Sequence, residues 1–222
     1  TDKQSYPANS DVQITTPVAN HGSFDGAVSV RWTIQTSNGE TVSTLADQSV
    51  SVASSGNQAA MATWNTGVIL AGQYQVKAQL LDANGQPYSE ALADFSIVGD
   101  DRTLAGKIRV DKQTYLPSDT VAVLSRVSNT SANLIQQDLL VSTRVLNPDG
   151  SVRWQQQETL PQLLANSLKD YPYSVGLANA PSGTYAVNLT VTDTAGNLQA
   201  SSNTQFTVQS TGATGAGLGG SV

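Results

Sequence analysis

The stretch DKQSY at Asp2–Tyr6 recurs as DKQTY at Asp111–Tyr115, 109 residues further along the chain. A turn containing Pro and Ser follows each copy, and then a strand pattern in which Val or Ile alternates with other residues. Further blocks match in the same order: GQYQV at Gly72–Val76 with GTYAV at Gly183–Val187, and FSI at Phe95–Ile97 with FTV at Phe206–Val208. Because the offset drifts only from 109 to 111 residues, we predict two copies of one unit.

Each unit has the hydrophobic pattern of short strands. The segments Val28–Ile34 and Tyr185–Val191 both alternate, which places their apolar side chains on one face. Asn38-Gly39 and Asp149-Gly150 predict tight type I′ hairpins, in which both central residues have positive φ. Leu160–Lys169 is interpreted as strand and loop, with one helical turn near Leu163. About seven short strands per unit of about 100 residues predict an all-β fold of two tandem immunoglobulin-like or fibronectin-III-like antiparallel β-sandwiches.

The unit boundaries follow from where the strand pattern stops. We expect a first sandwich at residues 1–99, a short polar linker at 100–106, a second sandwich at 107–209 and a flexible Gly/Ala-rich linker at 210–222. Leu218–Val222 repeats the apolar and Gly positions of Leu104–Ile108, so a third unit is expected to begin there. The hypothesis is a pair of repeats cut from a longer array.

A family resemblance rests on two of these motifs. The stretch DKQTYLPSDTV at Asp111–Val121 resembles the opening strand and turn of macroglobulin-like domains, although Pro7 comes one position early in the first copy. Gly183–Val187 followed by Asp193–Asn197 is similar to the closing hairpin of many bacterial Ig-like repeats. The whole unit resembles the extracellular, adhesion-related repeats of large bacterial surface proteins. This resemblance implies a fold family and a surface or secreted setting, and it implies no particular ligand or activity.

The composition excludes several classes of function. Lys and Arg number 11 against 17 Asp and Glu, so the net charge of −6 argues against a nucleic-acid partner. The absence of Cys excludes disulfides, thiolate catalysis and Cys–zinc sites, and a single His excludes a multi-His metal site. No apolar run approaches the roughly 18 residues that a membrane-spanning helix needs. Ser, Thr, Asn and Gln supply 81 of the 222 residues, which favours an uncharged polar surface.

Catalysis has one candidate base, the imidazole of His21. The second copy has Thr130 at the matching loop position, so His-dependent chemistry could occur in only one of the two units. No Gly-x-Ser-x-Gly motif is present either. We therefore expect His21 to be an ordinary loop residue, the chain not to be an enzyme, and no cofactor to be required.

Two kinds of stabilising site are weaker alternatives. The carboxylates of Asp100, Asp101 and Asp111 could converge on a calcium ion, although no Asp-x-Asp-x-Asp loop supports this and no metal site is assigned. Lys3 and Lys112, at matched positions, could form Lys–Asn isopeptide bonds, which require a buried Lys beside an Asn and a carboxylic acid. The simpler expectation is an exposed Lys next to an Asp.

The three tryptophans are candidates for a sugar-binding surface. Trp32 lies on the apolar face of an alternating segment, and Trp64 precedes a loop at a position that corresponds to Tyr173, so both are expected in the core. Trp154 follows a hairpin turn and has no aromatic counterpart in the first copy. Trp154 is therefore the candidate ligand-binding residue.

The expected function is structural. The repeat pair is predicted to be a non-enzymatic spacer of a large extracellular or adhesin-like surface protein, with neighbouring repeats of the same chain as partners. The alternative is a glycan- or protein-binding module of a secreted or cell-surface protein. The two hypotheses differ in whether one copy alone retains a ligand. Neither predicts a nucleic-acid partner or insertion into a membrane.

Overall fold

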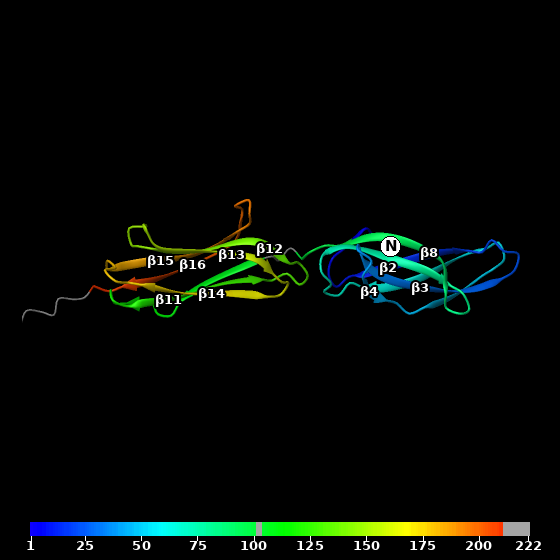
Figure 1. Cartoon of the computed structure of the whole chain (residues 1–222), viewed down its shortest axis with the longest axis horizontal. Coiled ribbons are helices and arrows are strands. Elements are labelled where there is room, and N and C mark those ends of the chain that lie inside the picture. Colours follow the sequence, from blue (N-terminus) through cyan, green and yellow to red (C-terminus); the bar gives the residue numbers. More distant parts are fainter. Residues whose placement is uncertain (101–103, 211–222) are drawn as a thin grey trace, which may run out of the picture. The chain divides into compact units, whose positions relative to one another are not determined.

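A computed structural model describes residues 1–100 and 104–210 of the chain (Figure 1). Contacts divide the chain into two compact units: unit 1 is Thr1–Asp101 with Ala132–Leu134, and unit 2 is Arg102–Ser131 with Ile135–Val222. Every regular element in the described ranges is a strand, so the predicted all-β fold is confirmed. No helix in these ranges is long and apolar enough to cross a bilayer.

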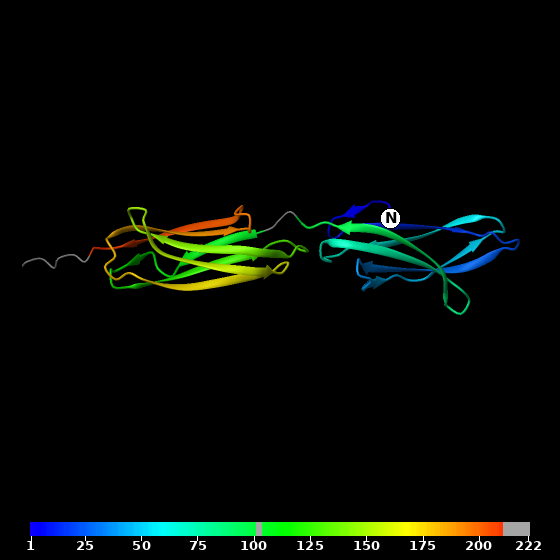
Figure 2. The same cartoon turned by 45° about the horizontal axis from the view of Figure 1, so that its top comes forward.

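Unit 1 is built from two sheets. Its strands are β1 (Ser5–Tyr6), β2 (Asp11–Ala19), β3 (Gly26–Thr36), β4 (Thr41–Thr44), β5 (Gln48–Val52), β6 (Asn57–Asn65), β7 (Gly72–Leu81) and β8 (Pro87–Ile97). One sheet has the order β1-β8-β7-β3-β4, with β5 also paired to β3, and β2 pairs with β6 in the other. The β7–β8 hairpin projects beyond the body of the unit (Figure 2).

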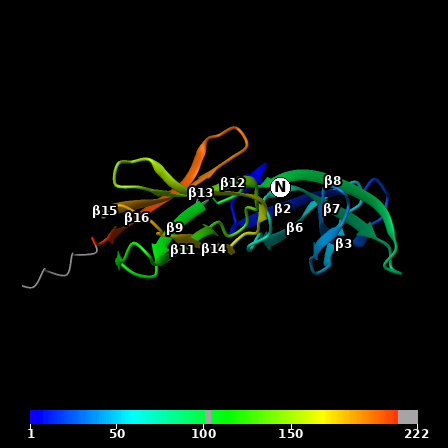
Figure 3. The same ribbon diagram turned by 60° about the vertical axis from the view of Figure 1, so that its left-hand side comes forward.

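Unit 2 repeats this arrangement. Its strands are β9 (Leu104–Val110), β10 (Thr114–Tyr115), β11 (Thr120–Asn129), β12 (Gln136–Leu146), β13 (Val152–Leu163), β14 (Leu168–Gly176), β15 (Gly183–Thr192) and β16 (Leu198–Val208). One sheet has the order β10-β16-β15-β12-β13 and the other β14-β11-β9. Figures 1 and 3 show the two sheets as separate layers, with β9, β11 and β14 together in one of them.

The core of each unit forms where the alternating apolar side chains of its two sheets meet. In β15, Tyr185, Val187, Leu189 and Val191 are fully buried, and the residues between them reach the surface in part. An aromatic group closes one end of each core. Phe206 packs edge-on against Tyr115, with ring centroids 5.1 Å apart, and stacks on Tyr185 at 5.0 Å. Phe95 does the same in unit 1 with Tyr6 and Tyr74, at 5.7 and 5.9 Å.

Two expected element boundaries differ from the structure. Strand β9 begins at Leu104, so residues 104–106, which we expected in the linker, belong to unit 2. Gly106 pairs with Val127, and a Cβ there would approach Leu189 to 3.3 Å, so this Gly permits close packing within the unit. Strands β13 and β14 are joined by a turn, and no helical turn forms near Leu163. Residues 101–103 of the predicted linker, and 211–222, lie outside the described residues.

The hairpins use a different turn from the type I′ that the dipeptides suggested. The N–H of Gly150 donates to the carbonyl of Asn147 at 2.9 Å, and the N–H of Asn147 donates to Ser151 at 2.8 Å. Gly150 has a φ of +84°, whereas Asp149 is not among the positive-φ residues. This is a three-residue loop with a Gly bulge. The loops ending at Gly39, Gly85 and Gly196 follow the same pattern.

Replacement of Gly150 by Ala is expected to destabilise unit 2 by about 1 kcal/mol, because an L-residue is strained at positive φ even with open space around it. Gly176 is the matched control, since its φ is not positive and nothing lies within 4 Å of an added Cβ. Gly176→Ala should be neutral or stabilising by a few tenths of a kcal/mol. Denaturant unfolding measures both variants, and equal losses would contradict the turn assignment.

Candidate functional site

Trp154, the predicted ligand-binding residue, lies on β13 opposite Val145 of β12. Its side chain is half-buried and packs against the core of unit 2. The indole lies 5.0 Å from the Tyr173 ring, between centroids, at an interplanar angle of 56°. Trp32 and Trp64 are buried in unit 1, as expected. Trp154 is therefore part of an aromatic pair rather than an isolated exposed ring, and ligand binding at this residue stays a prediction.

The surroundings of the Trp154–Tyr173 pair keep the Tyr173 hydroxyl protonated. Burial, together with the charge of Glu158, raises the pKa of Tyr173 to about 12. Burial and the same carboxylate also raise the pKa of Tyr171. Both phenols are therefore neutral at physiological pH, so the Trp154–Tyr173 pair offers ring faces and a neutral hydroxyl rather than a reactive phenolate.

The repeated Asp-Lys-x-x-Tyr motif forms a small hydrogen-bond network at the edge of each core. Asp111 Oδ1 accepts hydrogen bonds from the Tyr115 hydroxyl at 2.8 Å and from the Ala122 N–H at 2.8 Å. The N–H of Lys112 donates to the same hydroxyl at 2.9 Å. In unit 1, Asp2 accepts from the Tyr6 hydroxyl at 2.7 Å and from the Gln13 N–H at 2.9 Å, and the Lys3 N–H donates to Tyr6 at 2.9 Å. The motif thus has a structural role in both units.

These contacts bear on the two weaker alternatives. The ammonium groups of Lys3 and Lys112 are exposed and lie 5.9 and 6.0 Å from the rings of Tyr6 and Tyr115. An isopeptide bond requires a buried Lys, so that hypothesis is wrong. The described residues contain no group of three metal-ligating side chains, and Asp101, one of the three proposed calcium ligands, lies outside them.

His21 lies exposed in the loop after β2, at the rim of a hollow of about 310 Å³ in unit 1. The hollow has polar and apolar parts, and its lining includes Phe24, which is 85% exposed. The structure therefore places His21 on the surface beside apolar side chains.

The sequence analysis missed a cluster of cations on the outer face of the β14–β11–β9 sheet. Lys107 and Arg109 of β9 are exposed, and Arg126 of β11 is half-buried; we call these three residues the basic face. The register places Lys107 directly opposite Arg126, and Arg126 opposite Asp170 of β14. Arg126 binds Asp170 through both Nε and Nη2, at 2.6 and 2.7 Å. This ion pair holds the pKa of Asp170 below its usual value, and the charge of Arg109 adds to the effect.

The basic face borders two hollows. One, of about 110 Å³, is lined by Lys107, Arg109, Leu124 and Arg126. The other, of about 450 Å³, extends from Arg109 over β11 to Pro172 and Tyr173 of β14. The ring of Tyr173 itself lies on the other side of this sheet, against Trp154 and the core of unit 2. The alternation of Lys107 and Arg109 along β9 is visible in the sequence, but the position of Arg126 depends on the register between strands.

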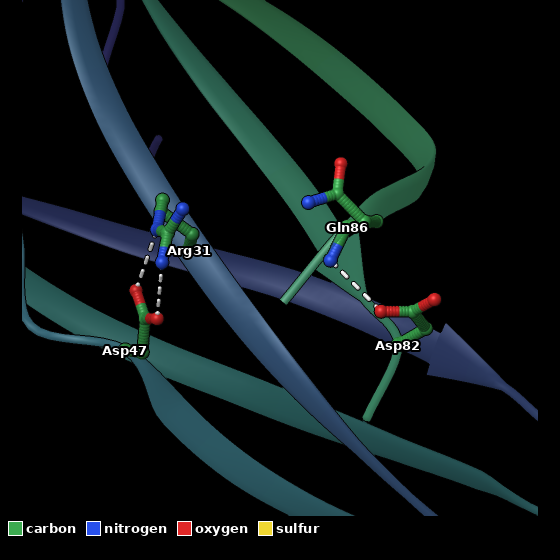
Figure 4. A network of polar contacts seen from close by, with 4 residues as sticks. All are labelled: Arg31, Asp47, Asp82 and Gln86. Atoms are coloured by element: carbon green, nitrogen blue, oxygen red, sulfur yellow. Dashed lines mark hydrogen bonds and ion pairs between the residues drawn. The ribbon is translucent and has the colours of Figure 1, made fainter. Parts of the chain in front are cut away.

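Unit 1 differs from this face at the positions of Arg126 and Asp170. Pro17 occupies the position of Arg126, and Ala59 pairs with it where Asp170 stands in unit 2. Residues 1–99 carry three Lys or Arg against eight Asp or Glu, whereas residues 104–210 carry seven of each. Two of the three cations of unit 1 are paired. Arg31 binds Asp47 through two hydrogen bonds of 2.9 and 2.8 Å (Figure 4). Lys77 binds Glu90 at 3.0 Å.

Figure 4 also shows how an acidic turn residue of unit 1 is used. The Oδ1 atom of Asp82 accepts the N–H of Gln86 at 2.8 Å across the β7–β8 turn. The carboxylate also accepts the N–H of Asn84 at 2.9 Å. Asp82 therefore stabilises its own turn, as Asp side chains commonly do in this position.

Comparisons with known proteins give little further information. No protein-family model matches the chain, and no curated protein matches it. Among solved structures, the chain is similar to a transglutaminase from red sea bream, with 12% sequence identity and a TM-score of 0.35. The match covers 94% of this chain and 30% of the transglutaminase. The chain therefore spans about a third of that protein's length.

Proposed function

We propose that the chain is a load-bearing spacer of a large extracellular surface protein, with neighbouring repeats of the same polypeptide as its partners. Each unit buries a core of its own, with no residue shared between the two hydrophobic clusters. The low charge and the many Ser, Thr, Asn and Gln residues favour a soluble surface with little affinity for other molecules. A Cys-free fold also needs no disulfide formation outside the cell.

The observation that carries this proposal is the pairing of an early strand with the last strand of each unit. Strand β1 pairs with β8 in parallel, and β10 pairs with β16 in parallel. In unit 1 the N–H groups of Ser96 and Val98 donate to Gln4 and Tyr6, both at 2.9 Å. In unit 2 those of Thr207 and Gln209 donate to Gln113 and Tyr115, both at 2.9 Å.

This geometry suits a chain under tension. When the two ends of a unit are pulled apart, parallel neighbours slide along each other, and their hydrogen bonds are loaded together. An antiparallel hairpin pulled from its two free ends opens one bond at a time. The same arrangement in both units supports a mechanical role for the repeat.

Force spectroscopy on the 222-residue chain tests this role. Gln209→Pro removes the N–H that donates to the Tyr115 carbonyl. The unfolding force of unit 2 is expected to fall, because one of the backbone hydrogen bonds that carry the load is lost. Gln209→Ala keeps the N–H and is the matched control. Unit 1, which is unchanged, supplies an internal reference in the same trace.

The pulling direction gives a second test. Because the chain has no Cys, handles can be placed on single introduced Cys residues. Pulling from the ends of unit 2 should require more force than pulling its β15–β16 hairpin open. Equal forces in the two directions, or a Gln209→Pro variant as resistant as Gln209→Ala, would contradict the proposal.

A further inference from the structure

The basic face of unit 2 places like charges close together, which destabilises the sheet. Lys107 and Arg126 stand directly opposite each other on neighbouring strands, and like charges in that position are destabilising. Asp170 offsets only one of the three cations, through its two bonds to Arg126. Within the described ranges, Lys107 and Arg109 form no ion pair. The face therefore has a surplus of positive charge in a chain whose net charge is −6.

An apolar floor lies beside these cations. Leu124 of β11 pairs with Arg109 of β9 on one side and with Pro172 of β14 on the other. Leu124 and Pro172 therefore form an apolar strip beside the row of Lys107, Arg126 and Asp170. Tyr173 lines the larger hollow, of about 450 Å³. Three residues of β11 lie between Ala122 and Arg126, and the four steps of about 3.4 Å give the surface a length of about 14 Å along the strand. The surface can therefore accept an extended ligand with both anionic and apolar parts.

We propose that the basic face binds an acidic polysaccharide, a chain of sugar rings that bear carboxylates. This binding function goes beyond the proposed spacer role. Arg126 already holds a carboxylate in a two-bond geometry, which shows the chemistry that a guanidinium on this surface supports. Arg109 and Lys107 are the groups that engage the ligand carboxylates, and the C–H faces of the sugar rings pack on Leu124 and Pro172.

Two other polyanions fit this surface less well. An acidic peptide that binds by β-augmentation would add to the edge strand β9, whereas the two hollows lie across neighbouring strands of the sheet and not along that edge. A nucleic acid requires many cations along its phosphates, and this face has three, one of them paired with Asp170. Side chains that project from the face of a sheet favour a ligand that is recognised through its own rings and carboxylates.

The proposal predicts that only one of the two copies binds. The corresponding face of unit 1 has Pro17 at the position of Arg126 and Thr15 at that of Leu124, with Met61 and Ala59 on the adjacent strand. Substitutions on unit 2 should therefore remove all the binding that the chain shows.

Isothermal titration of the 222-residue chain with polygalacturonate at low salt tests the proposal. We expect binding that weakens as NaCl is raised, and no binding to the uncharged polysaccharide dextran. Arg109→Gln should weaken binding about tenfold, since it removes a charge-assisted hydrogen bond. Arg144→Gln is the matched control, because Arg144 is also an exposed Arg of unit 2 but lies on β12 in the other sheet.

Two more variants separate binding from folding. Lys107→Gln removes the repulsion with Arg126, so it should leave the Tm unchanged or raise it while weakening binding. Asp170→Asn removes the competing carboxylate and frees Arg126, so it should strengthen binding several-fold. A purely structural role for these residues would not move affinity and stability in opposite directions.

Several results would overturn the proposal. Equal binding of dextran would show that charge is not recognised, and equal losses in Arg109→Gln and Arg144→Gln would show that the face is not the site. Tighter binding of poly-L-glutamate would identify an acidic peptide surface. Tighter binding of single-stranded DNA would identify a nucleic-acid surface. No binding of polygalacturonate at low salt would also reject the proposal.

Discussion

Replacement of Phe206 by Ala is expected to lower the free energy of unfolding of unit 2 by about 3–5 kcal/mol. The side chain is 1% exposed and lies between two tyrosine rings, edge-on to Tyr115 and stacked on Tyr185. Its removal loses the burial of the ring and two aromatic contacts, and leaves a cavity that the paired strands around it cannot close. This is the largest effect we expect from a single substitution in the unit.

Calorimetry of the whole chain measures the effect. The two cores share no residue, so Phe206→Ala should move the transition of unit 2 and leave that of unit 1 in place. Phe95→Ala makes the matched change in unit 1, where the ring packs on Tyr6 and Tyr74, and should move the other transition. Phe206→Leu keeps most of the buried volume and should cost less than Phe206→Ala. Equal shifts of both transitions would contradict independent cores.

The strands and the repeat could be predicted from the sequence because both depend on local periodicity. The alternation of Tyr185–Val191 specifies which side chains are buried, whatever strands lie on either side. The turn type could not be read in the same way. Asn38-Gly39 fits more than one hairpin, and only the hydrogen bonds show that Gly39 ends a three-residue loop.

The sites depended on contacts between distant strands. Trp154 has no aromatic neighbour in sequence, and its packing is set by Tyr173 on β14. The cluster of Lys107 with Arg126 arises from the pairing of β9 with β11, which no spacing along the chain specifies. The small residues Ala105 and Gly106 resembled a linker because the reason for the Gly, its closeness to Leu189, lies in another sheet.

Replacement of Asp111 by Ala is expected to destabilise unit 2 by about 1–3 kcal/mol at pH 7, because the Tyr115 hydroxyl and the Ala122 N–H lose their charged acceptor. The Tyr115 ring is 1% exposed, and its hydroxyl keeps only the N–H of Lys112 as a partner. Asp111→Asn retains an oxygen acceptor without the charge and should lose less. Asp2→Ala makes the same change in unit 1, where Tyr6 occupies the matching place.

The pH dependence distinguishes this contact from simple loss of packing. The Tyr115 hydroxyl, and less strongly the Ala122 N–H, hold the pKa of Asp111 below its usual value of 3.8. Its contribution is therefore present above the unfolded pKa and is lost as the pH falls through the lower folded pKa. Wild type and Asp111→Ala should converge in stability under acid, and a difference that persists undiminished below that range would contradict an ionised acceptor.

The same pair predicts a second loss of stability in alkali. Burial, and then the hydrogen bond to Asp111, raise the pKa of Tyr115 from 10.0 to about 12. A raised folded pKa stabilises the unit fully below the unfolded value, and that contribution is lost as the pH rises from about 10 to about 12. Tyr115→Phe, which has no proton to lose, should weaken this alkaline dependence. Because Asp111 is protonated in acid and Tyr115 is deprotonated in alkali, one hydrogen bond accounts for part of the stability lost at each end of the pH range.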